Sequence, residues 1–124
     1  LMIIIDTSVL VRFFTKDNPI AFRKVEKLLS SSEELFIPDV VFVELEHVLG
    51  KLYSASREEI AKAYHFLVGG RFITSREAVS ASALFSKKSL SIADCFLSIY
   101  GQKGKLASFD KKLLNSSGCL AYWT

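Results

Sequence analysis

Membrane spans, cysteine frameworks and phosphate-binding glycine loops are all missing from this sequence. No apolar run approaches the roughly 20 residues of a membrane span, and the apolar opening lacks the basic segment of a signal peptide. The only cysteines are Cys95 and Cys119, and their spacing fits neither a C-x-x-C motif nor a zinc site. We therefore expect a cytoplasmic protein with two reduced thiols; a disulfide between them is the alternative.

The chain has 124 residues, half of them apolar, which is enough interior for a single domain spanning residues 1–124. Sixteen basic against 13 acidic residues leave a formal net charge of +3. A charge this small does not by itself indicate a nucleic-acid binder. No Ser-His-Asp set is apparent, so nothing points to serine-hydrolase chemistry.

Short apolar runs alternate with helical patterns along the chain. Each expected strand is apolar at nearly every position, as in a parallel sheet covered on both faces. The expected strands are residues 2–5, 35–37, 71–74, 106–108 and 120–123. The expected helices are residues 9–14, 21–30, 40–53, 57–68, 76–87 and 92–102. This β-α-β alternation predicts an α/β fold, a three-layer α/β/α sandwich with right-handed crossovers.

Four acidic residues lie beside or inside apolar runs, where acids are poorly tolerated. Asp6 and Asp110 each follow such a run, whereas Glu44 and Asp94 lie inside one. A buried carboxylate costs several kcal/mol unless a positive or hydrogen-bonding group compensates it. Four carboxylates together would also repel one another, and their natural counter-charge is a divalent cation. The pattern therefore predicts a metal-dependent active site.

We expect these four side chains to meet at one edge of the sheet. In parallel α/β sheets, ligands bind at the carboxyl ends of the strands, where the strand order reverses. Asp6 and Asp110 each follow a strand, and neighbouring strands lie only ~5 Å apart. Glu44 lies in the second turn of the helix after the second strand. Asp94 opens the helix that runs back before the fourth strand, so both stay near the same edge.

Each acid also has a purely structural explanation. Asp6 and Asp110 suit the caps of the helices that follow them equally well. Asp94 stands three residues after Ser91, and this pattern taken alone is better explained as a capping box. Glu44 is harder to explain by structure, because its helical neighbours include three valines. Together the four favour a site, since otherwise the caps would fall on one edge by coincidence.

At these residues the sequence resembles the PIN-domain nucleases, specifically the VapC-type toxins of toxin–antitoxin pairs, along the whole chain. The matching motifs are Asp6-Thr7-Ser8, Val43-Glu44-Leu45, Ala93-Asp94-Cys95 and Ser108-Phe109-Asp110. Ser8 stands where the family more often has asparagine, and Ser108 where it has threonine. The resemblance implies a five-stranded parallel sheet of order 3-2-1-4-5, Mg²⁺ or Mn²⁺ bound by the acids, and endonucleolytic cleavage of RNA. It also implies a cognate antitoxin and a homodimer.

The acids would divide the chemistry of phosphodiester hydrolysis among them. Hard cations held by carboxylates acidify water and neutralise charge on the phosphate. In this hypothesis Asp6 and Asp110 are direct metal ligands, and Asp94 binds the same ion or a second one. Glu44 either binds metal or orients the attacking water.

Hydroxyl and basic side chains complete the predicted site. The hydroxyls expected to position carboxylates or substrate belong to Thr7, Ser8 and Ser108. The basic residues expected to contact the RNA backbone are Arg12, Lys111 and Lys112. Arg12 is explained equally well as a solvated surface residue.

The first helix carries more apolar residues than one buried face requires. Phe13 and Phe14, together with Tyr53 and Phe66, are candidates for a surface patch that binds a partner. Filling of the core is the alternative explanation, and we favour it for the rest of this helix.

Two other classes of function remain open. A phosphoryl-transfer or receiver-like domain also has an aspartate after its first strand, but it needs a second, paired aspartate there, which Asp6-Thr7-Ser8 lacks. A non-catalytic PIN-fold interaction module would have the same fold without the chemistry. The four acids argue against such a module, because an idle carboxylate cluster only destabilises a fold.

Overall fold

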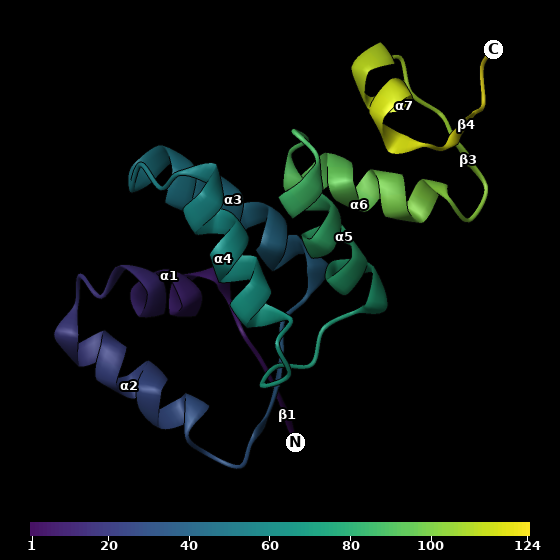
Figure 1. Cartoon of the computed structure of the whole chain (residues 1–124). Coiled ribbons are helices and arrows are strands. Elements are labelled where there is room, and N and C mark those ends of the chain that lie inside the picture. The colour runs from purple at the N-terminus through teal and green to yellow at the C-terminus, as the bar shows by residue number, and fades with distance from the viewer. The chain divides into compact units, whose positions relative to one another are not determined.

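The computed structural model describes all residues from 1 to 124, and they divide into two units, Leu1–Ser75 and Arg76–Thr124 (Figure 1). The first unit contains β1 (Met2–Ile4), α1 (Thr7–Thr15), α2 (Pro19–Leu29), β2 (Glu34–Phe36), α3 (Asp39–Leu52) and α4 (Arg57–Leu67). The second contains α5 (Arg76–Lys87), α6 (Ile92–Gly101), β3 (Lys105–Leu106), α7 (Lys111–Ser117) and β4 (Leu120–Ala121). None of these helices has the length and hydropathy that a membrane-spanning helix requires.

In the first unit, β1 and β2 run parallel, with Ile3 opposite Leu35. The pairing continues one residue further, because the N–H of Ile5 donates to the carbonyl of Phe36 at 2.8 Å. On the other side of β2, Ile73 forms a parallel bridge with Phe36 and donates its N–H to the carbonyl of Leu35 at 2.7 Å. The backbone order in this unit is therefore Ile73, β2, β1, which corresponds to the 3-2-1 part of the predicted order.

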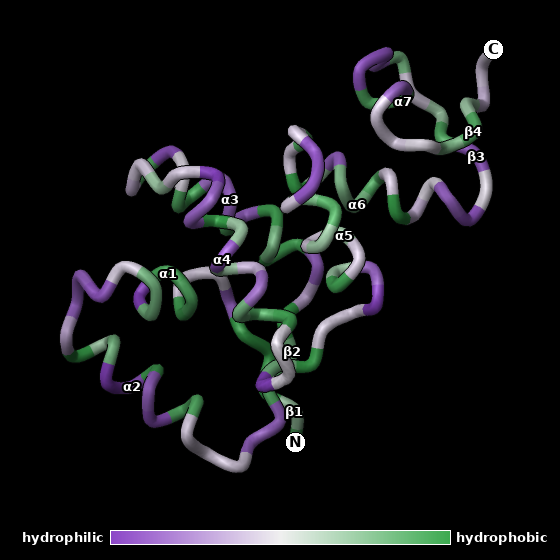
Figure 2. The backbone as a smooth tube through the Cα atoms, in the orientation of Figure 1, coloured by the Kyte–Doolittle hydropathy of each residue, from purple (hydrophilic) through white to green (hydrophobic).

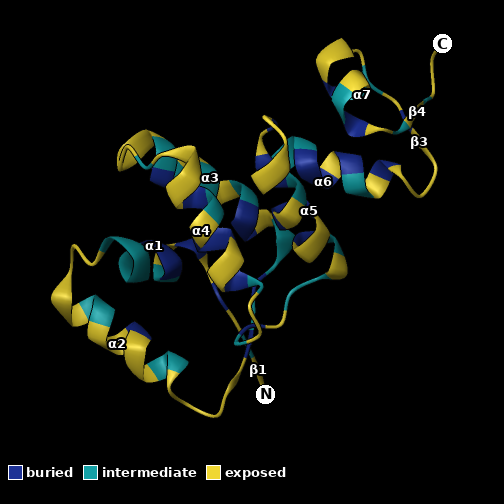
Figure 3. Cartoon of the chain, in the orientation of Figure 1, coloured by how far each residue is buried: buried dark blue, intermediate teal, exposed yellow.

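The core of the first unit holds these strands against the helices. Leu35, Tyr64 and Phe42 are all fully buried, and the Tyr64 hydroxyl donates to the Phe42 carbonyl at 2.7 Å. The helix of Tyr64, α4, begins at a capping box in which Ser56 and Glu59 each accept the other's backbone N–H. Figure 3 shows the result, with buried residues along one side of α3 and α4 and exposed residues along the other.

In the second unit, β3 and β4 form another parallel pair, which the N–H of Tyr122 extends by donating to the carbonyl of Leu106 at 2.9 Å. Helix α6 packs closely against the chain before β4. A Cβ at Gly101 would lie 2.9 Å from the sulfur of Cys119, so a larger residue there would require the Cys119 side chain to shift. The Cys119 thiol donates to the carbonyl of Ser98 at 3.2 Å, and no disulfide joins Cys119 to Cys95.

The fold is α/β, and the predicted helices form, with α5 having the predicted bounds. A five-stranded sheet is not confirmed, because the strands form two separate two-stranded pairs and one bridge. The strands are also shorter than predicted. After β1 and β2 the caps of the next helices, Asp6 and Pro38, follow within two residues and end the extended chain. Figure 2 shows both strands as mainly hydrophobic segments.

Candidate active site

Asp6 caps the helix that follows the first strand. Its backbone is extended, and its Oδ2 accepts hydrogen bonds from the Ser8 hydroxyl at 2.6 Å and from the Ser8 N–H at 3.2 Å. These bonds, the one from the hydroxyl above all, hold the pKa of the Asp6 carboxyl below its ordinary value. The cap therefore fixes an ionised carboxylate just beyond the carboxyl end of β1.

Glu44 is tied to this cap through the next residue of the chain. The Thr7 hydroxyl donates to Oε1 of Glu44 at 2.8 Å. Thr7 is buried, with 7% of its surface exposed, at the start of α1, and Glu44 lies in the second turn of α3. Because α1 and α3 pack together, this bond brings two of the four acidic motifs side by side, although they are 37 residues apart in sequence.

Asp110 is a helix cap in the second unit, as Asp6 is in the first. Its Oδ1 accepts the N–H of Leu113 at 3.0 Å, and its own N–H donates to the Ser108 hydroxyl at 3.0 Å. Exposed Lys111 and Lys112 occupy the first two positions of α7. Cations are disfavoured at a helix N-terminus, so local structure does not explain these two lysines.

Asp94 lies in the first turn of α6, and the capping box predicted for it is only half formed. The Ser91 hydroxyl accepts the N–H of Asp94 at 3.1 Å. The reciprocal bond, from the Ser91 N–H to the Asp94 carboxylate, is absent, whereas both bonds are present in the box of α4. The half-buried Asp94 carboxylate therefore makes no capping hydrogen bond.

The expectation that the four acids are buried is wrong. Asp6, Glu44 and Asp110 are exposed and Asp94 is half-buried. Some of the apolar neighbours that suggested burial are buried, such as Ile5 and Leu45, but others are exposed like the carboxylates, such as Val40 and Phe109. Neither unit by itself brings three or more His, Cys, Asp or Glu side chains together. Each unit supplies two of the four acids, and their convergence stays a prediction.

Arg12 has a partner that the sequence did not indicate. Its guanidinium donates to both carboxylate oxygens of Asp17, at 3.0 and 3.1 Å. Thr15 and Tyr53 also donate to Asp17, each at 2.9 Å, and together these bonds hold the pKa of Asp17 below its ordinary value. Asp17, which begins the turn sequence Asp17-Asn18-Pro19, thus joins the end of α1 to the residue after α3. The charge of Arg12 is balanced there, at the opposite end of α1 from Asp6.

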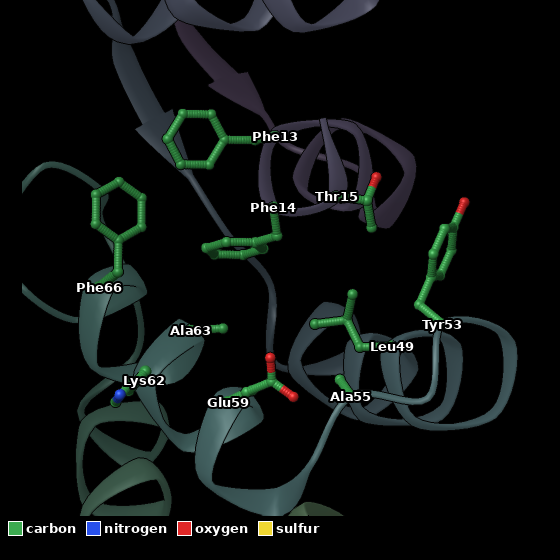
Figure 4. Close-up of a pocket in the computed structure, with 10 residues that line it drawn as sticks. All are labelled: Phe13, Phe14, Thr15, Leu49, Tyr53, Ala55, Glu59, Lys62, Ala63 and Phe66. Carbon is green, nitrogen blue, oxygen red and sulfur yellow. The ribbon is translucent and has the colours of Figure 1, made fainter. Parts of the chain in front are cut away.

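An aromatic pocket opens in the first unit between α1, α4 and the end of α3 (Figure 4). Its volume is about 800 Å³, and the rings that line it are Phe13, Phe14, Tyr53 and Phe66. Phe13 stacks on Phe66 with ring centroids 5.4 Å apart. These four are the residues of the predicted partner patch. They line a pocket instead of forming a flat patch, and Tyr53 and Phe66 are each 40% exposed.

The order of elements defines an α/β protein in which an acidic residue follows a strand in each unit, Asp6 after β1 and Asp110 after β3. Residues 3–115 match the PIN domain family, so nearly the whole chain is covered and the protein belongs to that family. PIN domains are typically nucleases, and these nucleases generally use divalent metal ions. No match was found among curated proteins.

The residues present fit such a cation. Carboxylate oxygens are the ligands that hard divalent ions prefer, and Asp6 is held in its ionised form. The hydroxyls of Ser8 and Thr7 each fix the position of one carboxylate, on Asp6 and Glu44 respectively, as the partners of metal ligands do. The donor set of the first unit therefore suits Mg²⁺ or Mn²⁺ better than a soft metal.

Proposed function

We propose that this PIN-domain protein is a metal-dependent endoribonuclease that hydrolyses RNA phosphodiester bonds, with residues 1–124 acting as one nuclease domain in the cytoplasm. The observation that carries the proposal is the 2.8 Å hydrogen bond from Thr7 to Glu44. Helix capping does not require this bond, because Asp6 already caps α1. Its effect is to hold two carboxylate-bearing segments together, as a cation site needs.

In this proposal the four acids, Asp6, Glu44, Asp94 and Asp110, hold Mg²⁺ or Mn²⁺. A cation bound there lowers the pKa of water and neutralises charge on the scissile phosphate. The hydroxyls of Ser8, Thr7 and Ser108 keep the carboxylates or the adjoining backbone in place.

Basic side chains close to these acids would bind the phosphates of the RNA backbone. Lys111 and Lys112 directly follow Asp110 and are exposed, so they suit contacts with RNA phosphates. Arg12 is a weaker candidate than the sequence suggested, because Asp17 already balances its charge.

Cleavage of a labelled single-stranded RNA by the purified chain tests the nuclease proposal. Internal fragments should appear with Mg²⁺ or Mn²⁺ and vanish with a chelator. Asp6→Asn should abolish cleavage, and since asparagine caps helices as well as aspartate does, the loss would not come from α1. The matched control is Glu26→Gln, which removes one exposed carboxylate from α2 and should cleave like the wild type.

Two results would overturn the proposal. Undiminished cleavage by Asp6→Asn would remove the carboxylate from the chemistry. A folded wild-type protein that cleaves no RNA with any divalent metal would instead favour a non-catalytic PIN interaction module.

Within the PIN-domain nucleases, we propose that this protein is a VapC-type toxin that forms a homodimer and is inhibited by a cognate antitoxin. The order of the acidic motifs supports the toxin assignment, and the aromatic pocket supports a protein partner. Its exposed rings, Tyr53 and Phe66, suit the apolar face of a partner helix.

The toxin proposal is tested in cells. Expression of the chain alone should arrest growth, and co-expression with a small reading frame next to its gene should relieve the arrest. Phe66→Glu should abolish this relief while leaving RNA cleavage intact. No growth arrest from a protein that cleaves RNA in vitro would favour an RNA-processing role over a toxin.

The homodimer is tested separately on the purified protein, for which light scattering should give twice the mass of one chain.

A further inference from the structure

Three aromatic side chains are exposed next to one another in the second unit. Phe109 is 87% exposed, Tyr122 60% and Trp123 53%. The rings of Phe109 and Trp123 stack with centroids 4.7 Å apart and planes within 11° of parallel, and Tyr122 meets Trp123 edge-on at 5.2 Å. These three residues form a preassembled surface that we call the aromatic platform.

The parallel pairing of β3 and β4 places the platform at a strand edge. Phe109 follows the end of β3 by three residues, and Trp123 follows the end of β4 by two. Because the strands are parallel and lie side by side (Figure 1), both segments leave the pair at its carboxyl edge. Parallel α/β folds bind their ligands at this edge. Asp110, one of the proposed metal ligands, is the residue directly after Phe109.

The charge around the platform favours an anionic ligand. The second unit carries seven Lys or Arg against three Asp or Glu, whereas the first carries nine against ten. Lys111 and Lys112 lie two and three residues beyond Phe109, and neither forms an ion pair. The excess positive charge of the chain is thus concentrated in the unit that displays the aromatic rings.

We propose that the aromatic platform stacks a base of single-stranded RNA beside Asp110 while Lys111 and Lys112 contact the flanking phosphates. This inference rests on the proposed nuclease function and names the substrate form that the site takes. Exposed rings next to lysines are the pattern by which proteins bind single strands with little sequence preference, because every base has a face that can stack. Bases inside a duplex are already stacked and paired, so the platform selects unpaired RNA.

The experiment uses the only tryptophan of the chain, Trp123, as the reporter. The full-length protein is titrated in a chelator, so that no cleavage occurs, with decamers of adenosine and of uridine. Both should quench Trp123 fluorescence, and adenosine should bind more tightly because its larger base stacks better. A ribose-phosphate decamer without bases should bind at least tenfold more weakly. The matching duplex should also bind weakly.

Substitutions at Phe109 separate stacking from simple apolar contact. Phe109→Ala should weaken adenosine decamer binding by about 5- to 150-fold, and Phe109→Tyr should restore it. Phe109→Leu keeps an apolar side chain without a ring face and should bind as weakly as Phe109→Ala. Leu120→Ala, which removes another exposed apolar side chain of the same strand pair, is the control and should bind like the wild type.

The outcomes keep this inference apart from the nuclease proposal. If the wild type cleaves RNA with Mn²⁺ but Phe109→Ala binds the decamers unchanged, stacking is refuted and the nuclease stands. If the wild type cleaves nothing yet the Phe109 series behaves as described, the binding surface stands and the nuclease fails. If Phe109→Leu retains full affinity, or Phe109→Ala changes only self-association in sedimentation, the platform is a protein-docking surface and the inference is overturned.

Discussion

Replacing Thr7 by valine tests whether the bond to Glu44 serves catalysis or only the fold. Valine keeps the branched shape of threonine in its buried position and removes only the hydroxyl that donates to Glu44 at 2.8 Å. A hydrogen bond to a charged group contributes about 1.5–3 kcal/mol when its partner is shielded from water. Glu44 is exposed, so water replaces the lost donor, and we expect a stability loss of only about 0.5–1 kcal/mol.

The expected loss of activity is larger than this stability loss. Removing the hydrogen-bond partner of a metal ligand typically costs about 10- to 100-fold in metal affinity or activity. Single-turnover cleavage of a labelled RNA at saturating Mn²⁺ should therefore slow by about that factor in Thr7→Val. The melting temperature should fall by no more than about 5 °C.

A second threonine of the same helix provides the control. Thr15 also donates its hydroxyl to a carboxylate, on Asp17 at 2.9 Å, but at the opposite end of α1. Thr15→Val should melt at a lower temperature than the wild type and still cleave RNA normally, while Thr7→Ser keeps the donor and should retain most of the activity. If Thr7→Val cleaves as fast as Thr15→Val, the bond to Glu44 is structural and our reasoning is refuted.

Three other outcomes are expected. Millimolar Mn²⁺ should raise the melting temperature of the wild type, and a shift of the same size in Asp6→Asn would show that this carboxylate is not a ligand. The pKa of Asp17 is lowered by bonds from Thr15 and Arg12. This stabilisation is present above the unfolded pKa of about 4 and is lost as pH falls through the lower folded value. The stability of Asp17→Asn should therefore depend less on pH below about pH 4 than the stability of the wild type. The same pH dependence in both proteins would contradict a stabilising role for the Asp17 carboxylate. Glu59→Ala should lower the melting temperature whereas Asp94→Ala should not, and equal losses would mean that both are caps.

Six of the seven helices could be predicted closely from the sequence because their signals are local, whereas α7 was not among the expected helices. A capping box spans four residues, and the box at Ser56 and Glu59 fixes the start of α4 at Arg57, where the expected helix over residues 57–68 also begins. The positions of the strands could be predicted but their end residues could not, because an apolar run does not reveal where the pairing of two strands ends. In the last run, residues 120–123, only the first two residues form β4, and Trp123 stacks on Phe109 instead.

Contacts across long sequence separations could not be predicted. Asp17 occurs in Asp17-Asn18-Pro19, which indicates a turn, and nothing local reveals its bond to Tyr53, 36 residues away. The burial of the acids was overestimated for a related reason. Glu44 shares α3 with buried Val41 and Leu45, but it lies on the exposed side of the helix with Val40, which is 61% exposed. Apolar neighbours in sequence therefore do not establish that a helical carboxylate is buried.

Two helices with the same sequence pattern at their start show how the structure separates a cap from a site. Ser56 with Glu59 and Ser91 with Asp94 both have the spacing of a capping box, and in both the serine hydroxyl accepts the third N–H of its helix. Glu59 returns the bond to the serine N–H, and this bond lowers its pKa. Asp94 does not return it. Because the serine alone already caps α6, the Asp94 carboxylate interacts with this helix end only through the helix dipole. It makes no capping hydrogen bond, and we therefore expect its oxygens to be available to a ligand.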